Sequence, residues 1–357
     1  MHKTKNIILC LASLLFFLPA IALADSRDLI VSMTLTRLES QRAVVPSQMQ
    51  PSYNPALRDV KMNQALAQRA PEKEIPPPAK TKPKEKAMRP PPTDTGIQRT
   101  GFYVSGGYNL SHLHYKEFDT DGSGDILDRD YGTLHGYYVN AGYRSPDYYE
   151  WALGRPFVEL YYRRAADMIT YDGQTQSGIP VKFDEELARI HRYGIKLGAS
   201  QDLNGKHGEL FGYLDAGRRI WVRGQNKIIT TDIGDKQDSQ EIYHWIYFGG
   251  GAGVNYEFIP KLSTGIDVEL MYAYSPKMKE TLDGFKFKLH NVWGVEVKLP
   301  IKYYILQNIS LDFTPYFTFW WIKMSDIIPI GGGLGVVEPT SHTYMNGLLA
   351  GLTWYFN

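Results

Sequence analysis

The sequence has few residues of several types, and each shortage excludes a class of protein. Its single cysteine, Cys10, lies in an apolar segment near the start, so the rest of the chain has no disulfide and no thiolate metal site. The 39 basic and 38 acidic residues nearly cancel, which leaves no overall field to attract nucleic acid. From Gly101 onward no run of about 18 apolar residues occurs, so no membrane-spanning helix is expected there.

The first 24 residues have the pattern of a signal peptide. Lys3 and Lys5 precede an apolar run over residues 7–20, and Ala22-Leu23-Ala24 forms a small-x-small cleavage site. An uncleaved membrane anchor is the alternative interpretation. Because Cys10 lies inside this run, it is not a lipoprotein cysteine. The sequence therefore predicts that the protein is exported.

Residues 25–99 are predicted to form a tail without a core of its own. They contain one Tyr, one Gly, no Trp and eleven of the 21 prolines, and residues 71–98 are rich in Pro, Lys and Glu. We expect a periplasmic spacer that reaches peptidoglycan or an inner-membrane protein. A solvated linker without a partner is the alternative.

Residues 100–357 repeat a different theme, in which apolar and polar residues alternate over about a dozen positions before a break. In "STGIDVELMYAY", for example, Ile266, Val268 and Leu270 fall on one face and Asp267 and Glu269 on the other. A period of two is typical of a strand with one face in an apolar medium. Such segments occur near residues 101–116, 131–144, 156–171, 186–202, 208–226, 240–258, 262–276, 290–305, 309–323 and 343–356.

The alternation fits either a soluble β-sandwich or a transmembrane β-barrel, and three features favour the barrel. Many apolar faces are long enough for a tilted strand to cross a bilayer, and aromatic residues collect at the strand ends. The polar face also carries seven acidic and seven basic residues, which a narrow barrel would pair across its lumen. These predicted lumen residues are Glu159, Arg163, Asp167, Arg192, Lys196, Asp215, Arg219, Arg223, Asp267, Glu269, Glu296, Lys298, Lys302 and Asp312.

The breaks between the segments alternate in length. Those after even-numbered segments are mostly short, and those after odd-numbered segments are long, polar and rich in Gly and Asp. Short periplasmic turns and long external loops are typical of outer-membrane barrels. We therefore predict an all-β, antiparallel up-and-down barrel of about ten strands, with eight or twelve as alternatives.

The two ends of this region resemble known bacterial proteins. The last segment, "TYMNGLLAGLTWYFN", resembles the C-terminal insertion signal of outer-membrane β-barrel proteins, although Asn357 follows the usual final aromatic residue. Its outward positions are Leu348, Ala350, Leu352, Trp354 and Phe356. The opening "GFYVSGGYNLS" resembles the first strand of small OmpA-like or opacity-type barrels. The resemblance implies a Gram-negative outer membrane, contact with its lipid and lipopolysaccharide, and insertion by the barrel-assembly machinery.

The stretch "DTDGSGDILDRD" has the ligand spacing of a calcium loop. Asp119, Asp121, Ser123 and Asp125 occupy alternate positions, Gly124 suits the tight turn, and Asp130 closes the twelve residues. The segment joins two predicted strands, so an EF-hand with its flanking helices is excluded. A calcium site in an external loop is one interpretation, and a hydrophilic acidic loop is the other. No other cofactor is expected.

Seven histidines fall at the predicted external ends of strands: His112, His114, His135, His191, His244, His290 and His342. If they converge on one rim, they would bind a transition metal or gate the mouth by protonation near pH 6. The alternative is that histidine simply suits a wet interface.

No enzymatic motif was found, so no enzyme activity is expected. A lipid-hydrolase barrel needs a nucleophilic Ser two residues after a His, and Tyr344 stands at that place after His342. The omptin proteases resemble the chain in strand number, but no matching Asp–His cluster is evident. The favoured function is a narrow passive channel for ions or small solutes. The alternatives are a closed structural or adhesin-type barrel and, less favoured, a rim-site enzyme.

Overall fold

The computed structural model describes residues 100–120, 123–174, 179–203, 207–231, 234–332 and 334–356. The predicted signal peptide (1–24) and the predicted tail (25–99) both lie outside these residues, so both stay predictions. Within them, no helix is long and apolar enough to cross a membrane.

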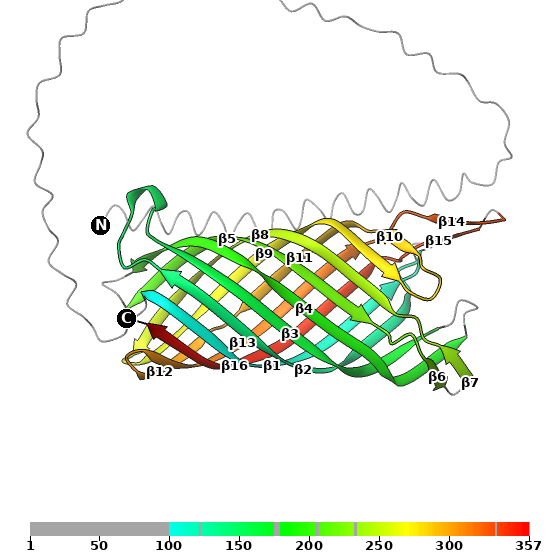
Figure 1. Cartoon of the computed structure of the whole chain (residues 1–357), viewed down its shortest axis with the longest axis horizontal. Coiled ribbons are helices and arrows are strands. Elements are labelled where there is room, and N and C mark those ends of the chain that lie inside the picture. Colours follow the sequence, from blue (N-terminus) through cyan, green and yellow to red (C-terminus); the bar gives the residue numbers. More distant parts are fainter. Residues whose placement is uncertain are drawn as a thin grey trace, which may run out of the picture. The chain divides into compact units, whose positions relative to one another are not determined.

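Residues 101–356 form one antiparallel β-barrel (Figure 1). In the part of the chain that is described, ten strand positions close the ring; we call each position a stave, whether one strand or two consecutive strands fill it. The staves are β1 (Gly101–Phe118), β2 (Ile126–Arg144), β3 (Arg155–Gln174), β4 (Pro180–Leu203), β5 (Gly208–Arg223), β8 (Glu241–Ile259), β9 (Leu262–Glu280), β11 (His290–Lys298) continued by β12 (Ile301–Leu306), β13 (Ile309–Lys323) and β16 (Ser341–Phe356). Each stave pairs with its neighbours in sequence, and β1 pairs with β16 to close the ring. The predicted fold class and the predicted count of ten are confirmed.

The two ends of the barrel differ as the sequence predicted. At the end where Phe102 pairs with Phe356, most connections are short, such as residues 260–261 and 307–308; we call this the turn end. At the other end, the loop end, the connections are long and carry small extra strands (Figure 1). These are β6 (Ile228–Thr231), β7 (Gly234–Gln237), β10 (Lys286–Lys288), β14 (Ile328–Gly331) and β15 (Leu334–Val336). The turn between β2 and β3 is the longest at this end and holds a short 3-10 helix, η1 (Glu150–Ala152).

The outer surface carries an apolar belt, because alternate residues of every long strand point outward. Its members are large apolar side chains exposed on the outer wall, among them Phe102, Val104, Tyr108, Leu110, Tyr137, Val139, Leu160, Leu197, Leu214, Phe248, Ile266, Leu270, Tyr272, Phe313, Phe317, Leu352, Trp354 and Phe356. In water such a surface would be strongly unfavourable. In lipid it is the surface that a closed barrel requires, since the strands direct their backbone polar groups to one another and only side chains face the hydrocarbon.

The core lies inside the barrel rather than between two sheets. In the half of the lumen nearer the loop end, large apolar and aromatic side chains are fully buried, including Leu113, Leu134, Trp221, Trp245 and Trp320. We call this group the apolar plug. The inward face is therefore charged in the middle of the barrel, apolar next to it on the loop-end side, and charged again at the loop end itself.

Candidate functional site

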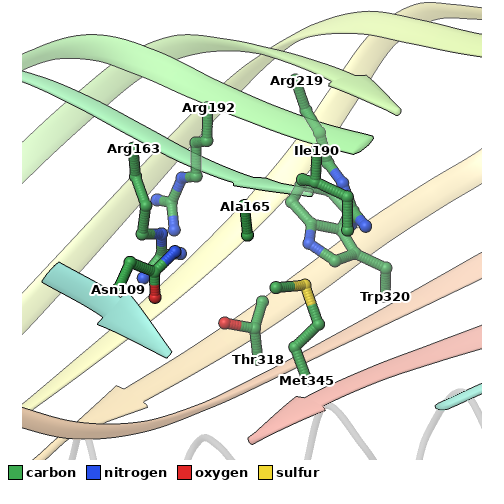
Figure 2. A pocket seen from close by; sticks show the side chains of 9 residues that line it. All are labelled: Asn109, Arg163, Ala165, Ile190, Arg192, Arg219, Thr318, Trp320 and Met345. Atoms are coloured by element: carbon green, nitrogen blue, oxygen red, sulfur yellow. The ribbon is translucent and has the colours of Figure 1, made fainter. Parts of the chain in front are cut away.

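Three arginines stand side by side on the inner wall. Arg163 of β3 pairs in register with Arg192 of β4, which pairs with Arg219 of β5. Adjacent strands place paired residues about 5 Å apart, so three like charges occupy one rung of the ladder. Figure 2 shows Arg163 and Arg192 on one side of a small cavity and Arg219 against Trp320 on the other. Such a row requires acidic partners from elsewhere in the barrel.

Glu296 of β11 supplies the main acidic contact from the opposite wall. Arg163 Nη2 lies 2.5 Å and Arg192 Nη1 2.9 Å from Glu296 Oε2, and Lys298 Nζ lies 3.0 Å from Oε1. Thr318 Oγ1 also donates to this carboxylate at 2.8 Å. With a side chain only 1 % exposed, Glu296 joins β3, β4, β11 and β13 through the lumen.

Glu269 of β9 is the second acidic centre. Arg192 Nη2 donates to Glu269 Oε1 at 2.6 Å, and Lys196 Nζ donates to Oε2 at 3.1 Å. Asp215 accepts from Arg192, and Asp267 accepts from Lys298. The connected group, which we call the central network, therefore holds four cations (Arg163, Arg192, Lys196, Lys298) and four acids (Asp215, Asp267, Glu269, Glu296), so its formal charges cancel.

Tyrosine hydroxyls complete the central network, and a glycine makes room for them. Tyr161 donates to Asp215, and Arg192 Nε donates to Tyr247 Oη at 2.6 Å. A Cβ on Gly217 would lie 2.5 Å from Tyr247 Oη and 2.6 Å from Tyr161 Oη. Only glycine leaves space for both rings at this point of β5.

Between the central network and the turn end lies a polar cavity of about 220 Å³. Tyr103 donates to Glu159 at 2.7 Å in its wall, and Lys302 Nζ lies 3.8 Å from Asp312. Arg144 forms a buried ion pair with Glu209 nearby. Of these groups, Lys302 and Arg144 have acidic partners, and Glu159 accepts from a tyrosine hydroxyl.

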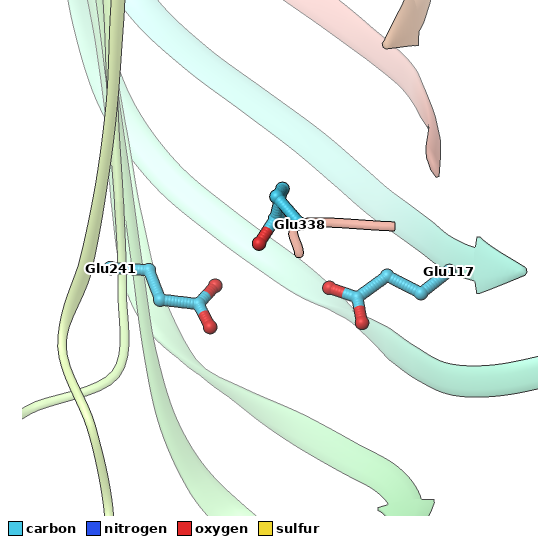
Figure 3. Close-up of side chains that lie close together, drawn as sticks. All are labelled: Glu117, Glu241 and Glu338. Carbon is cyan, nitrogen blue, oxygen red and sulfur yellow. The ribbon is translucent and has the colours of Figure 1, made fainter. Parts of the chain in front are cut away.

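At the loop end a single cation, Arg223, faces an acidic group. Its guanidinium contacts Glu117, Asp128, Asp130, Glu186 and Glu241 at 2.6–3.8 Å. Glu338, from the segment between β15 and β16, points toward Glu117 and Glu241 (Figure 3). Tyr243 donates to Glu338 Oε1 at 2.5 Å. Burial, with Glu241 and Glu117 adding to it, raises the pKa of Glu338 well above its usual value.

The carboxylate oxygens of Glu117, Glu241 and Glu338 lie within 4.8 Å of one another. Oxygen ligands at this spacing are the kind that a hard cation such as Ca²⁺ takes. Among the described residues, this is the one group of three or more metal-ligating side chains so closely placed. Arg223 already contacts two of its members, so a proton or a cation is equally able to offset the remaining charge.

The structure places the predicted lumen residues inside the barrel, with the exception of Asp167. Its side chain is 43 % exposed, and its Oδ2 lies 3.7 Å from Nε2 of the outward-facing His135. The β2–β3 ladder is interrupted here, between the pairs Tyr131–Thr170 and His135–Ala166, which explains why alternation alone misplaced Asp167. Arg219 and Arg223 point inward as expected but lie outside the central network.

The candidate calcium loop is only partly described. Asp119 N donates to Asp125 O, and Asp125 N donates to Ser123 Oγ, so these residues form a turn between β1 and β2. Asp121 lies outside the described residues. Asp130, the expected closing ligand, is a strand residue that points into the lumen and accepts from Arg223 Nε at 2.6 Å. Calcium binding by the loop stays a prediction, with Asp130 engaged elsewhere.

The seven histidines do not converge. His112, His114, His135, His191, His244 and His342 lie on the outward side of their strands, because their sequence neighbours Leu113, Leu134, Ile190, Trp245 and Thr343 are buried in the lumen. His290, at the start of β11, contacts Asp326 at 2.7 Å. The metal-ligating group found among the described residues contains no histidine.

The residues of the predicted insertion signal lie on the outward side of β16. Leu352, Trp354 and Phe356 are half exposed, and Trp354 stacks on Phe356 at 5.6 Å between ring centroids. Their role in membrane insertion stays a prediction.

Several residues of the site escaped sequence reasoning. The tyrosines of the central network and two tryptophans of the apolar plug, Trp221 and Trp245, were assigned no role. Trp320 was counted among the interfacial aromatic residues at the strand ends, whereas the structure buries it in the lumen. The alternation does predict that these residues face inward. Which inward residues meet across the lumen, however, depends on how the barrel closes. The His290–Asp326 pair was missed for the same reason, since the two residues stand 36 positions apart.

No protein-family model matches the sequence, and no curated protein matches it either. Among solved structures, the outer membrane protease OmpT from Escherichia coli is similar with a TM-score of 0.45 and 8% identity, covering 71% of this chain and 96% of that one. The outer membrane protein OprG from Pseudomonas aeruginosa is similar with a TM-score of 0.33 and 11% identity, covering 73% of this chain and 99% of that one. Neisserial surface protein A is similar with a TM-score of 0.29 and 11% identity, covering 72% of this chain and 98% of that one. At these scores the likenesses say nothing about function.

The assignment of the fold rests instead on the molecule itself. A ladder of ten staves without a free edge, an apolar belt around the outside and paired charges within are the features that a bilayer selects in a β-sheet protein. The chain is a transmembrane β-barrel of the outer-membrane type.

Proposed function

We propose that this protein is a closed, non-conducting outer-membrane barrel that acts as a scaffold and presents its loop end to the outside. The apolar plug carries the proposal. Trp221, Trp245 and Trp320 are each at most 1 % exposed and lie within the lumen with Leu113 and Leu134. An aqueous pore needs a polar, hydrated path, whereas these side chains pack against one another from opposite walls.

The central network supports the same interpretation. Arg192 and Glu296 contact each other and further partners at 3.3 Å or less, and their side chains are 7 % and 1 % exposed. Charges that line a pore are free to contact passing ions, whereas these saturate one another across the lumen. The sequence favoured a narrow channel, and the packing favours the closed alternative.

The loop end supplies surface for contacts with other molecules. Near the β14–β15 hairpin, Ile327, Ile330 and Leu334 are 69 %, 50 % and 67 % exposed. Neighbouring exposed apolar side chains on a loop are a common property of interaction surfaces. The proposed contact of the tail with a periplasmic partner concerns residues outside the described part and stays a prediction.

Single-channel recording in a planar bilayer tests the proposal. The refolded full-length mature chain should insert without steady conductance steps, with and without millimolar calcium, because the apolar plug blocks the lumen. Insertion must be verified separately, by resistance of the folded barrel to denaturation in detergent. Steady steps from the folded wild-type barrel would overturn the closed scaffold and restore the channel hypothesis.

A further inference from the structure

Arg219 differs from the other cations of the lumen because it has no acidic partner in the described part of the chain. Its side chain is fully buried, with the residue 2 % exposed, and Nε, Nη1 and Nη2 are all without a hydrogen-bond partner. Arg163 and Arg192, its neighbours on the same rung, each contact Glu296. A guanidinium keeps its charge in proteins, so Arg219 cannot escape this position by losing a proton.

The surrounding charges leave Arg219 uncompensated. The central network is neutral by itself, with four cations and four acids, and Arg219 is absent from its ion pairs. Adding Arg219 gives five positive and four negative charges, a surplus of one. A buried charge is strongly unfavourable unless it is paired. The surplus therefore calls for one negative charge.

The aromatic rings around Arg219 satisfy only part of this need. Its guanidinium carbon lies 5.0 Å from the Trp320 ring, 5.4 Å from the Trp245 ring and 6.0 Å from the Trp221 ring. These cation–π contacts are favourable, but a ring face does not replace a hydrogen-bond acceptor in the guanidinium plane. Moreover, Nε1 of Trp221 and Nε1 of Trp245 are also buried without partners. The region thus collects buried donors that have no partner among the described residues.

Arg219 lines one side of a small cavity (Figure 2). Its volume is about 20 Å³, and Arg163, Arg192, Arg219 and Trp320 are among its lining residues. This volume holds one particle the size of a water molecule. A water molecule would accept hydrogen bonds but leave the surplus charge, and a carboxylate or sulfate is too large.

We propose that this cavity binds a single small monovalent anion of the halide class, with chloride as the physiological occupant. Arg219 is its main ligand, through N–H groups that have no other acceptor. The bound anion offsets the one surplus positive charge of the central network and Arg219, and it links the arginine row to the apolar plug. The site is independent of whether the barrel conducts.

Bromide, which scatters anomalously, locates such a site directly. Crystals of the full-length mature chain in detergent, grown with sodium bromide in place of chloride, should show a bromide peak within hydrogen-bond distance of the Arg219 guanidinium. Absence of a peak there would overturn the proposal, as would bromide at surface positions only. In either case the tryptophan rings alone would be holding the cation.

A solution measurement tests the same site through stability. Urea unfolding of the wild-type barrel is followed as gluconate is replaced by chloride at constant ionic strength. Above the dissociation constant, each tenfold rise in chloride should multiply the folding equilibrium constant by up to about tenfold. Arg219→Met should lose this dependence, whereas Arg155→Met, at a surface ion pair with Asp202, should keep it. A wild-type barrel indifferent to chloride would contradict the proposal even if Arg219→Met fails to fold.

Discussion

Glu296 is the residue on which most cations of the central network converge. Arg163, Arg192 and Lys298 all contact its carboxylate, which is shielded from solvent. Replacing one member of a buried ionic group leaves the charges of its partners uncompensated. The resulting destabilisation is larger than the net contribution of the intact group to the free energy of unfolding. At this scale, stability depends on whether each buried charge has an opposite charge within contact distance.

Glu296→Gln should therefore lower the free energy of unfolding by about 3–5 kcal/mol, measured by urea denaturation in lipid vesicles. Arg155→Gln is the matched control, because it removes an ion pair with Asp202 whose side chains are 25 % and 35 % exposed. Its loss should be about 0–1 kcal/mol. Equal losses for the two variants would show that the central network is not a stabilising unit.

Glu338 should make the loop end sensitive to pH. Because its pKa is raised in the folded barrel, the folded state binds a proton that the unfolded chain releases above about pH 4.3. Stability should then fall as the pH rises from that value toward the raised pKa. Arg223 and Tyr243 favour the charged form, and Glu117 and Glu241 oppose it.

Glu338→Gln keeps an acceptor for Tyr243 and carries no charge, so it should remove this part of the pH dependence. Near pH 4 the variant and the wild type should unfold at the same urea concentration. Near pH 8 the variant should unfold at a higher urea concentration than the wild type. Glu185→Gln, at an exposed pair with Lys227, is the control and should leave the curve unchanged. Parallel pH curves for Glu338→Gln and the wild type would refute the prediction.

At the scale of single strands, alternation decides which side chains meet lipid. On β5, Leu214 points outward and is 72 % exposed, while Asp215 next to it is buried in the lumen. Farther along the same outward face, Ile220 pairs with His191 and His244 near the loop end. The penalty for a charge on this face should depend on depth, because only the middle of the belt lies in hydrocarbon.

Leu214→Arg should lower the free energy of unfolding by about 2–4 kcal/mol, and Ile220→Arg by about 0–1 kcal/mol. Both variants add the same side chain to the same face of one strand, so the comparison isolates depth. Urea unfolding in vesicles of fixed lipid composition measures both. Equal losses would mean that the belt does not end between these positions.

One strand was predicted as continuous over residues 290–305, and the structure divides it into β11 and β12. The break falls at Pro300, which has no N–H to donate to a ladder. Pro315 of the neighbouring β13 lies opposite, and Leu299 N donates to its carbonyl oxygen at 2.9 Å. The apolar alternation continues through Leu299 and Ile301, which explains why the pattern alone did not show the interruption.

At the scale of the whole molecule, closure of the sheet brings distant side chains together in the lumen. The ring centroids of Trp245 of β8 and Trp320 of β13 lie 5.3 Å apart, and those of Trp221 of β5 and Tyr115 of β1 lie 4.8 Å apart. In the conductance measurement, a variant with Trp221, Trp245 and Trp320 all changed to alanine should conduct if the plug is the barrier. Trp354→Ala, on the outward face, should stay silent. A silent but folded triple variant would place the barrier in the central network instead.

The sequence by itself determined the barrel. Alternation, strand length and loop length are local properties, and together they predicted ten staves, the outward belt and an inward set of charges. Only the tertiary structure decided what the lumen is. Whether inward charges line a pore or neutralise one another depends on which of them face each other across the closed sheet. Arg163 and Glu296, for example, form an ion pair although 133 positions separate them in the sequence. The unpartnered Arg219 was invisible in the sequence for the same reason, because a missing partner is a property of the closed barrel and not of any strand.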